Sequence, residues 1–159
     1  MDAEPRPLVD DRVNIPDDTL LYRRVPWDLV GGKAKCPLGE SPSLSGNAFR
    51  DWSAELARSR GYAGPCMSVG VGTMLNDPQQ MLGEERQGYG VAVVRAGDMR
   101  TLTRRNGTTQ EPQGIMLSPT DAEPWHGVVF CLDGSRRKDP VCAAISDHAA
   151  WVIPLLNDD

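Results

Sequence analysis

The sequence predicts an α+β fold: a mostly antiparallel sheet of about five short strands flanked by about three short helices. Two apolar runs of strand length, YGVAVVR at 89–95 and GVVFCL at 127–132, are rich in β-branched residues and are followed by turn signals. Asp-Pro pairs at 77–78 and 139–140 are typical helix starts, because Asp caps a helix and Pro is tolerated at its first position. Strands and helices do not alternate regularly, which favours an antiparallel sheet over a doubly wound parallel one.

Length and charge indicate one globular body with acidic ends. A chain of 159 residues fits one domain, and a hydrophobic content of 40% with a mean hydropathy of −0.40 is typical of a globular protein. Of the net charge of −5, residues 1–18 contribute −4 through six acids and two arginines, while Asp158 and Asp159 contribute −2. We therefore expect a disordered acidic leader over residues 1–18 and a single globular α+β domain over residues 19–156.

The first half of the chain is expected to contain two strands and two helices, with one long loop after the first strand. Phe49, Trp52 and Leu56 recur at three- and four-residue spacing, which indicates a helix that Gly61 ends. Met67 to Gly72 alternates larger and smaller side chains, as a short strand does. The expected elements are, in order, a strand at 19–25, a loop at 30–46, a helix at 47–60, a strand at 66–72 and an exposed helix at 79–87.

The second half is expected to end in a strand, a basic loop and a helix. Asn106-Gly107 is the usual chemistry of a hairpin turn. Val141, Ile145, His148 and Val152 fall at spacings of four, three and four, so one helix face should carry all of them. The expected elements are a strand at 89–95, a brief helix at 99–102, strands at 114–117 and 127–132, and a helix from 139 that ends soon before Pro154.

The loop before the C-terminal helix is a candidate anion site. Free backbone N–H groups and the dipole at a helix start attract an anion, so a phosphate or an acidic partner is one interpretation. The other is a solvated basic turn balanced by Asp133 and Asp139, which the lack of a phosphate-loop spacing favours. The anion-binding candidates are Ser135, Arg136, Arg137 and Lys138.

Four further residues are candidates for catalysis or ligand binding: His126, Arg23, Arg24 and Ser68. His126 begins a buried strand, where a histidine can act as a general base or can simply be hydrogen-bonded at the strand edge. Arg23 and Arg24 are consecutive on a strand, so only one is expected to face a cleft, where it needs an acid or a ligand. Ser68 lies near glycines that permit close approach of a ligand, although no Gly-x-Ser-x-Gly motif surrounds it.

Other polar residues are expected to be structural. His148 is predicted to be a hydrogen-bonded core residue, and Glu84 and Glu85 to lie on the exposed face of a helix. The four cysteines form no Cys-x-x-Cys pair and only two histidines accompany them, so no metal, disulfide framework or cofactor is predicted; Cys131 and Cys142 are expected in the core. No apolar stretch suits a membrane span and no export signal is visible, so we expect a soluble cytoplasmic protein without a membrane partner.

Several stretches resemble a set of small uncharacterised bacterial proteins of similar length. They are LYRRV followed by Trp, a Ser-rich loop running into NAF-RD, a Met-Ser-Val strand, GYGVAVV and WHGVVF, which together span most of residues 19–153. This resemblance implies no activity, because none is assigned to those proteins. The chain is also similar to ADP-ribosyltransferase-like, NAD-consuming toxin domains, which place an arginine on the first strand, a serine on a later strand and a catalytic glutamate further on. Arg23 or Arg24 and Ser68 match the first two positions, whereas the later strands GIML and GVVFCL contain no acid.

Three functions remain open on these observations. The leading hypothesis is an accessory or interaction module of a bacterial intracellular system, such as a defence or toxin–antitoxin locus, whose acidic tails engage a protein partner. The alternative is a small nucleotide- or NAD-binding enzyme, ADP-ribosyltransferase-like, in which the four candidate residues and the basic loop converge on a nucleotide or phosphate ligand. The third is local RNA or DNA phosphate binding through the basic turns at 104–105 and 136–138; the nearly neutral body makes nucleic acid an unlikely partner.

Overall fold

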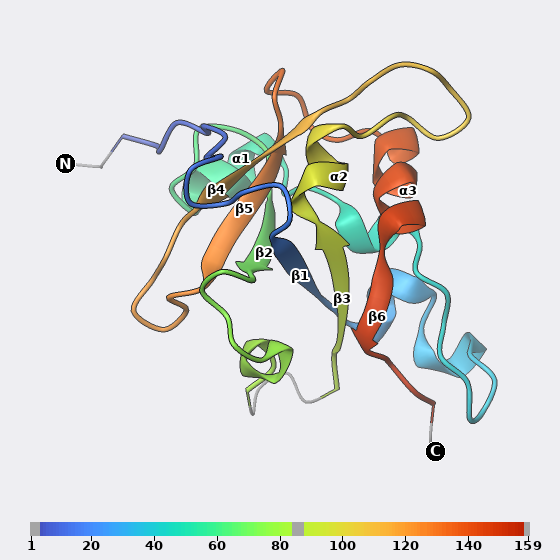
Figure 1. Ribbon diagram of the computed structural model, residues 1–159. Helices are drawn as coiled ribbons and strands as arrows, with labels where there is room; N and C mark the ends of the chain where they lie inside the picture. The colour runs from blue at the N-terminus through green and yellow to red at the C-terminus, as the bar shows by residue number, and fades with distance from the viewer. Residues whose placement is uncertain (1–3, 84–87, 158–159) are drawn as a thin grey trace.

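The computed structural model describes residues 4–83 and 88–157 and shows a six-stranded sheet (Figure 1). Its strand order is β4-β5-β2-β1-β3-β6, and every neighbouring pair runs antiparallel. The predicted α+β class with a mostly antiparallel sheet is confirmed, with one strand more than expected. The strands are β1 (Leu20–Val25), β2 (Met67–Val71), β3 (Gly90–Arg95), β4 (Gln113–Leu117), β5 (His126–Cys131) and β6 (Ala150–Ile153).

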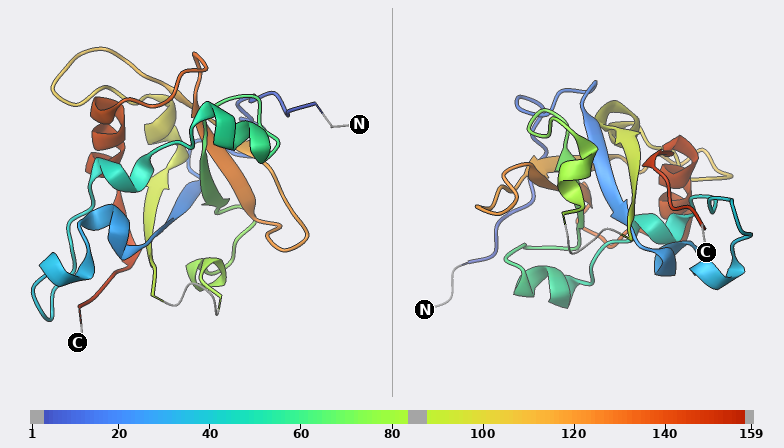
Figure 2. Two further views of the ribbon diagram at one scale, coloured as in Figure 1. Left: turned by 180° about the vertical axis from the view of Figure 1, so that it is seen from behind. Right: turned by 90° about the horizontal axis from the view of Figure 1, so that it is seen from below.

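Short helices cover both faces of this sheet. The α-helices are α1 (Ala54–Ser59), α2 (Ala96–Arg100) and α3 (Asp139–His148), and the 3-10 helices are η1 (Trp27–Val30), η2 (Lys33–Lys35), η3 (Gly46–Phe49) and η4 (Pro78–Met81). Helices of this length are marginal alone, so their stability comes from packing against the strands. The reverse view in Figure 2 shows α1 beside the end of the sheet that holds β2 and β5.

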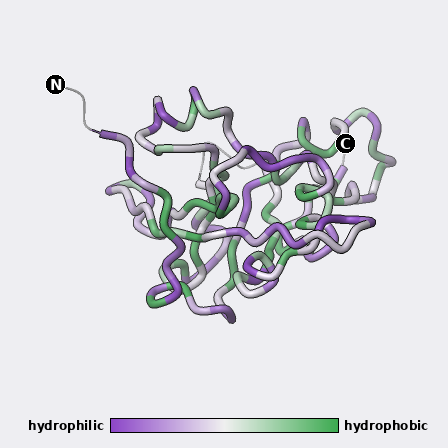
Figure 3. Tube along the Cα trace, turned by 90° about the horizontal axis from the view of Figure 1, so that it is seen from above, coloured by the Kyte–Doolittle hydropathy of each residue, from purple (hydrophilic) through white to green (hydrophobic). Residues whose placement is uncertain are grey.

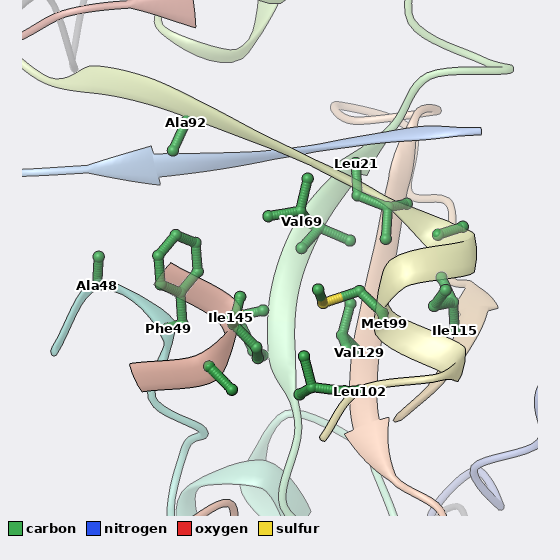
Figure 4. Close-up of a cluster of buried hydrophobic side chains, with 14 of the residues drawn as sticks. Leu21, Ala48, Phe49, Val69, Ala92, Met99, Leu102, Ile115, Val129 and Ile145 are labelled. Atoms are coloured by element: carbon green, nitrogen blue, oxygen red, sulfur yellow. The ribbon is translucent and has the colours of Figure 1, made fainter. Parts of the chain in front are cut away.

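The main core lies on the face covered by η3, α2 and α3. Alternate residues of neighbouring strands point to it, including Leu21 of β1, Val69 of β2 and Val129 of β5, all of which are buried. Phe49 of η3 and Ile145 of α3 pack against these strands (Figure 4). Each such side chain stabilises the fold by about 1.5–3 kcal/mol through its burial. Along the trace, hydrophobic and hydrophilic stretches alternate, as expected for strands joined by surface loops (Figure 3).

The opposite face carries two smaller hydrophobic clusters. One lies under α1 and includes Tyr62, Val128 and Phe130, with Trp52 packed at its edge. The other lies beside η4 and includes Leu75, Met81 and Trp125, with Tyr89 packed at its edge. Trp52 and Tyr89 both line the pocket described below, so that pocket opens between the two clusters.

The prediction of a disordered acidic leader is wrong for residues 4–18. Ile15 is fully buried in the main core. The side chain of Arg100 is only 2% exposed and forms ion pairs with Asp10 at 3.2 Å and Asp17 at 2.9 Å. Asp10 Oδ1 also accepts a hydrogen bond from the Ile115 N–H of β4. The acids of this segment are therefore partners of a buried arginine and an edge strand, which their composition alone does not reveal.

The C-terminal helix ends earlier than predicted. It stops at His148, Ala149 is extended, and β6 pairs with β3, so Val152 does not share a helix face with Val141. His148 is exposed rather than buried in the core, and its Nδ1 lies 3.9 Å from Asp98. Trp151, Val152 and Ile153 have high strand propensity and complete the sheet edge, and this tertiary pairing outweighs the helical spacing.

The predicted helix over residues 47–60 is split in two. η3 ends at Phe49, the chain is extended at Arg50, and α1 begins only after Ser53, whose side chain accepts a hydrogen bond from Leu56 N–H. The break has a physical cause, because the buried Asp51 side chain turns away to bind Arg137.

The remaining expectations have mixed outcomes. The Asp77 helix start is confirmed, since Asp77 and Gln80 form a reciprocal capping box, but η4 ends at Met81. The rest of the predicted exposed helix, including Glu84 and Glu85, lies outside the described residues. Cys131 and Cys142 are buried as predicted. No helix in the described ranges has the length and apolar character needed to cross a membrane.

Candidate functional site

One pocket gathers the four residues that the sequence singled out. Arg23 and Arg24 of β1, Ser68 of β2 and His126 at the start of β5 all line a pocket of about 350 Å³. The strands β5, β2 and β1 are neighbours in the sheet, which explains why residues over one hundred positions apart meet here. The pocket also takes in side chains that the sequence did not single out as site residues, namely Trp52, Arg60, Tyr89 and Glu123.

Arg23 reaches the pocket through a gap in the sheet. The ladder between β1 and β2 has the register pairs Leu21↔Val71 and Tyr22↔Gly70, and it does not continue to Ser68. Arg23 instead donates from Nη1 to the Ser68 carbonyl at 2.8 Å and from Nε to the Ala48 carbonyl at 3.0 Å. The expectation that only one of the two consecutive arginines faces a cleft is therefore wrong.

The charge of Arg23 has no carboxylate partner among the described residues. Burial, and then the positive charges of Arg137 and Arg24, lower the pKa of Arg23 to about 10, so the guanidinium still carries its charge at neutral pH. Its Nη2 makes no hydrogen bond to a described residue, and the Arg23 side chain is partly buried and lines the pocket. This leaves one donor group of a half-buried cation open to the pocket.

Arg24, by contrast, is held by several partners. Its Nη1 donates to Glu123 Oε2 at 2.9 Å and to the Met81 carbonyl at 3.0 Å. Its guanidinium also lies over the ring of Trp125, 5.6 Å from the centroid, a cation–π arrangement. These contacts fix both Arg24 and Glu123 at the wall of the pocket.

Ser68 and His126 form a hydrogen-bonded pair with a defined direction. Ser68 Oγ lies 2.7 Å from His126 Nε2, and His126 Nδ1 lies 2.9 Å from the Ser118 carbonyl oxygen. A carbonyl can only accept, so Nδ1 carries the proton, and Nε2 of the neutral ring accepts from the Ser68 hydroxyl. Burial lowers the pKa of His126, which favours this neutral form.

Ser118 fixes the orientation of the histidine. Its N–H donates to the His126 carbonyl at 2.9 Å, while its carbonyl accepts from the His126 ring. Its own hydroxyl is held by Tyr62 Oη at 2.6 Å and by Arg6 Nη1 at 2.8 Å. Ser118, which orients His126, is thus held by Tyr62 of the hydrophobic cluster under α1 and by Arg6 of the N-terminal segment.

The outer wall of the pocket combines aromatic rings with a third arginine. Arg60, at the end of α1, lies over the Trp52 ring at 4.7 Å from the centroid. Tyr89, just before β3, lines the same pocket. Nothing in the sequence pattern marked these three as site residues, because Trp52 fits a helix face and Arg60 a helix end. For Glu123, its place three residues before His126 was the available signal.

The basic loop at 135–138 does not join this pocket. The side chain of Arg137 is fully buried, where it pairs with Asp51 at 2.6 Å and donates to Gln113 and the Phe49 carbonyl. Arg137 is therefore unavailable to an external anion, contrary to the prediction for it. Ser135, Arg136 and Lys138 line a separate cavity of about 40 Å³, and for them the anion site stays a prediction.

Three of the five cations of the two basic turns, Arg104, Arg105 and Arg137, pair with acids of the chain. Arg104 pairs with Glu111 at 2.6 Å, and Arg105 donates from Nε to Asp147 at 2.9 Å. Arg104 lines the small cavity together with Arg136 and Lys138, so parts of both turns do lie close together. Acids line that cavity as well, which weakens its attraction for a phosphate backbone.

Comparison with known proteins adds no relative: no family model matches the chain, and neither a curated protein nor a solved structure is similar to it. Within the described ranges, no group of three or more His, Cys, Asp or Glu side chains is arranged to hold a metal ion.

Proposed function

We propose that the protein binds NAD in this pocket and is an ADP-ribosyltransferase-like enzyme. The observation that carries the proposal is the convergence of Arg23 on β1, Ser68 on β2 and Glu123 before β5. These are the three residue types that such domains are described above as using. Glu123 supplies the carboxylate that the later strands lack, because it stands in the loop that leads into β5.

The charge of the pocket supports a ligand that carries phosphate. Three arginines and one glutamate line it, and His126 is neutral, so the lining has a net charge of +2. Guanidinium groups bind phosphate oxygens with parallel hydrogen bonds, more specifically than an ammonium does. Arg23 is the partly buried arginine with a donor to spare, since its Nη2 makes no hydrogen bond to a described residue, whereas Arg24 is held by Glu123 and the Met81 carbonyl.

The volume of the pocket and the side chains that line it support binding of one nucleotide half of a dinucleotide rather than of a macromolecule. About 350 Å³ lies at the lower end of the roughly 300–1,000 Å³ typical of ligand pockets. Trp52 and Tyr89 offer aromatic surface on which a planar ring can pack. A ligand with a planar base or nicotinamide ring joined to a phosphate meets both requirements.

The interaction-module hypothesis rests on the lack of a complete catalytic set, the nearly neutral body and the acidic ends, and the geometry bears on the first and the last of these. The candidate residues come together in one pocket, so a set of chemically useful groups is present. Two acids of the N-terminal segment, Asp10 and Asp17, pair with Arg100, so part of the acidic charge of this segment is already balanced within the chain. We therefore place the pocket, rather than the acidic ends, at the centre of the function.

Isothermal titration of the purified full chain with NAD tests this proposal. ADP-ribose, ATP and uncharged nicotinamide serve as comparison ligands. Arg23→Gln removes a charge-assisted contact of about 1.5–3 kcal/mol, so NAD affinity should fall by at least about tenfold. Arg58→Gln is the matched control, because Arg58 is an exposed residue of α1 that lies outside the pocket.

Binding of NAD that weakens in Arg23→Gln and not in Arg58→Gln supports the proposal. Equal loss in both variants points to a diffuse electrostatic effect and counts against a built site. Absence of NAD binding with clear binding of ATP moves the protein to another nucleotide class. Absence of binding by every ligand ends the proposal.

A further inference from the structure

We propose that His126, acting through the Ser68 hydroxyl, is the general base that removes the proton of the nucleophile attacking the bound nucleotide. This inference rests on the proposed function, because it assigns a role within the same pocket. It adds His126 to the arginine, serine and glutamate on which the proposed function depends. The supporting geometry is the 2.7 Å contact between Ser68 Oγ and His126 Nε2, both of which line the pocket.

The proton arrangement of the pair suits a base. Because Nδ1 donates to the Ser118 carbonyl, the lone pair of the ring lies on Nε2, where the Ser68 hydroxyl donates to it. Ser68 is only partly buried, whereas His126 is 7% exposed. A nucleophile in the pocket therefore reaches Ser68 first, and the hydroxyl can pass its own proton to Nε2 while taking one from the nucleophile.

The carboxylate of the pocket is less suited to this task. Glu123 is already paired with Arg24 at 2.9 Å, and taking up a proton would break that ion pair. His126 loses no ion pair on protonation among the described residues, since its ring contacts Ser68 and a backbone carbonyl. The geometry thus separates the two groups, with Glu123 as a fixed negative charge and His126 as the proton acceptor.

The reaction balances with one base and no acid. Water attacks C1′ of the nicotinamide ribose and forms a C1′–O bond. The C1′–N1 bond to nicotinamide breaks, and its electron pair stays on N1, which turns the cationic ring of NAD into neutral nicotinamide. The leaving group therefore needs no proton. The attacking water gives one proton to Ser68 as Ser68 gives its own to His126 Nε2, and the imidazolium then releases it to solvent.

Release of nicotinamide from NAD by the full chain, followed by chromatography, tests the role of the pair. His126→Ala and Ser68→Ala should lower turnover by about 10²–10⁴-fold, the usual range for loss of a general base, and His126→Ala should change NAD affinity by less than about threefold. Added imidazole should restore part of the turnover of His126→Ala and none of Ser68→Ala. His148→Gln and Ser41→Ala are controls, because both residues are exposed and outside the pocket.

The outcomes separate the two proposals. If NAD does not bind the wild-type protein, the proposed function fails and the role of His126 fails with it. If NAD binds and no nicotinamide is released, or if His126→Ala keeps full turnover, binding stands and the general-base role is overturned. Circular dichroism checks each variant for folding; should His126→Ala not fold, Ser68→Ala and the wild-type protein carry the test, since Ser68→Ala only shortens a partly exposed side chain.

Discussion

Arg23 donates from Nη1 to the Ser68 carbonyl at 2.8 Å and so takes the place that a strand N–H would occupy in a continuous ladder. The sheet remains hydrogen-bonded at this point, but a cation rather than a second strand satisfies the carbonyl. This arrangement leaves a positively charged opening in the middle of the sheet. The local break in strand pairing is therefore what creates the pocket.

Replacing Arg23 with Met should change stability little and abolish ligand binding. The variant loses two charge-assisted hydrogen bonds to carbonyls, of about 1.5–3 kcal/mol each, but this loss is offset because it also removes a half-buried cation that has no carboxylate partner among the described residues. We expect the free energy of unfolding to stay within about 1.5 kcal/mol of wild type in urea titrations, with NAD binding lost in calorimetry. A loss of stability above about 3 kcal/mol would instead make Arg23 a structural residue.

Asp51→Asn should have the opposite profile, because the pair of Asp51 and Arg137 is structural. Both side chains are fully buried and lie 2.6 Å apart. Removing the carboxylate charge leaves Arg137 uncompensated in the core, which typically costs about 3–5 kcal/mol of stability. Urea unfolding should show this loss, whereas Asp139→Asn, which breaks the exposed pair with Arg50, should cost less than about 1 kcal/mol. Similar values for the two variants would contradict this assignment.

Arg23 and Arg137 illustrate which features of the site can be predicted from the sequence and which cannot. Periodicity and turn chemistry located the strands and marked Arg23, Ser68 and His126, since these properties depend on neighbouring residues. Pairing of strands distant in sequence brought them together, and no local pattern encodes it. The basic loop looked like an anion site because Arg137 follows another arginine, while its true partner, Asp51, lies 86 positions earlier.

Two local patterns were outweighed by tertiary contacts. The spacing of Val141, Ile145 and Val152 fits a helix, yet residues 150–153 gain more by pairing with the open edge of β3. The acids of the N-terminal segment fit a disordered tail, yet Arg100 needs them as counter-charges. In both places the deciding partner comes from a distant part of the chain.

Asp10→Asn should loosen the N-terminal segment from the body. Asp10 accepts hydrogen bonds from Arg100 and from the Ile115 N–H, each worth about 1.5–3 kcal/mol when one partner is charged. Hydrogen-exchange mass spectrometry should therefore show faster exchange over residues 4–18 and near Ile115. Asp18→Asn is the control, because Asp18 is exposed and makes no ion pair with a described residue. Unchanged exchange in Asp10→Asn would show that the other contacts of the segment, such as Ile15 burial and the pair of Asp17 with Arg100, are sufficient to hold it.

His126 should give stability a pH dependence of known sign. Burial lowers its pKa below 6.5; the Ser118 carbonyl and Glu123 oppose this, and Arg24 and Arg6 add to it. In the unfolded chain the ring titrates near 6.5, so as the pH falls below that value the unfolded state takes up a proton that the folded state does not. This contribution to the free energy of unfolding is fully present above 6.5 and is lost as the pH falls through the window between 6.5 and the lower folded pKa.

Urea titrations between about pH 7.5 and 5 measure this slope. His126→Gln should lose less stability than wild type as the pH falls. His148→Gln, which alters an exposed ring, should lose as much stability as wild type. Parallel curves for wild type and His126→Gln would mean that His126 is equally basic in the folded and unfolded states. Protonation of the folded ring would prevent Nε2 from accepting the Ser68 hydroxyl, so nicotinamide release should decline only as the pH falls through the lower folded pKa of His126, at the acid end of that window.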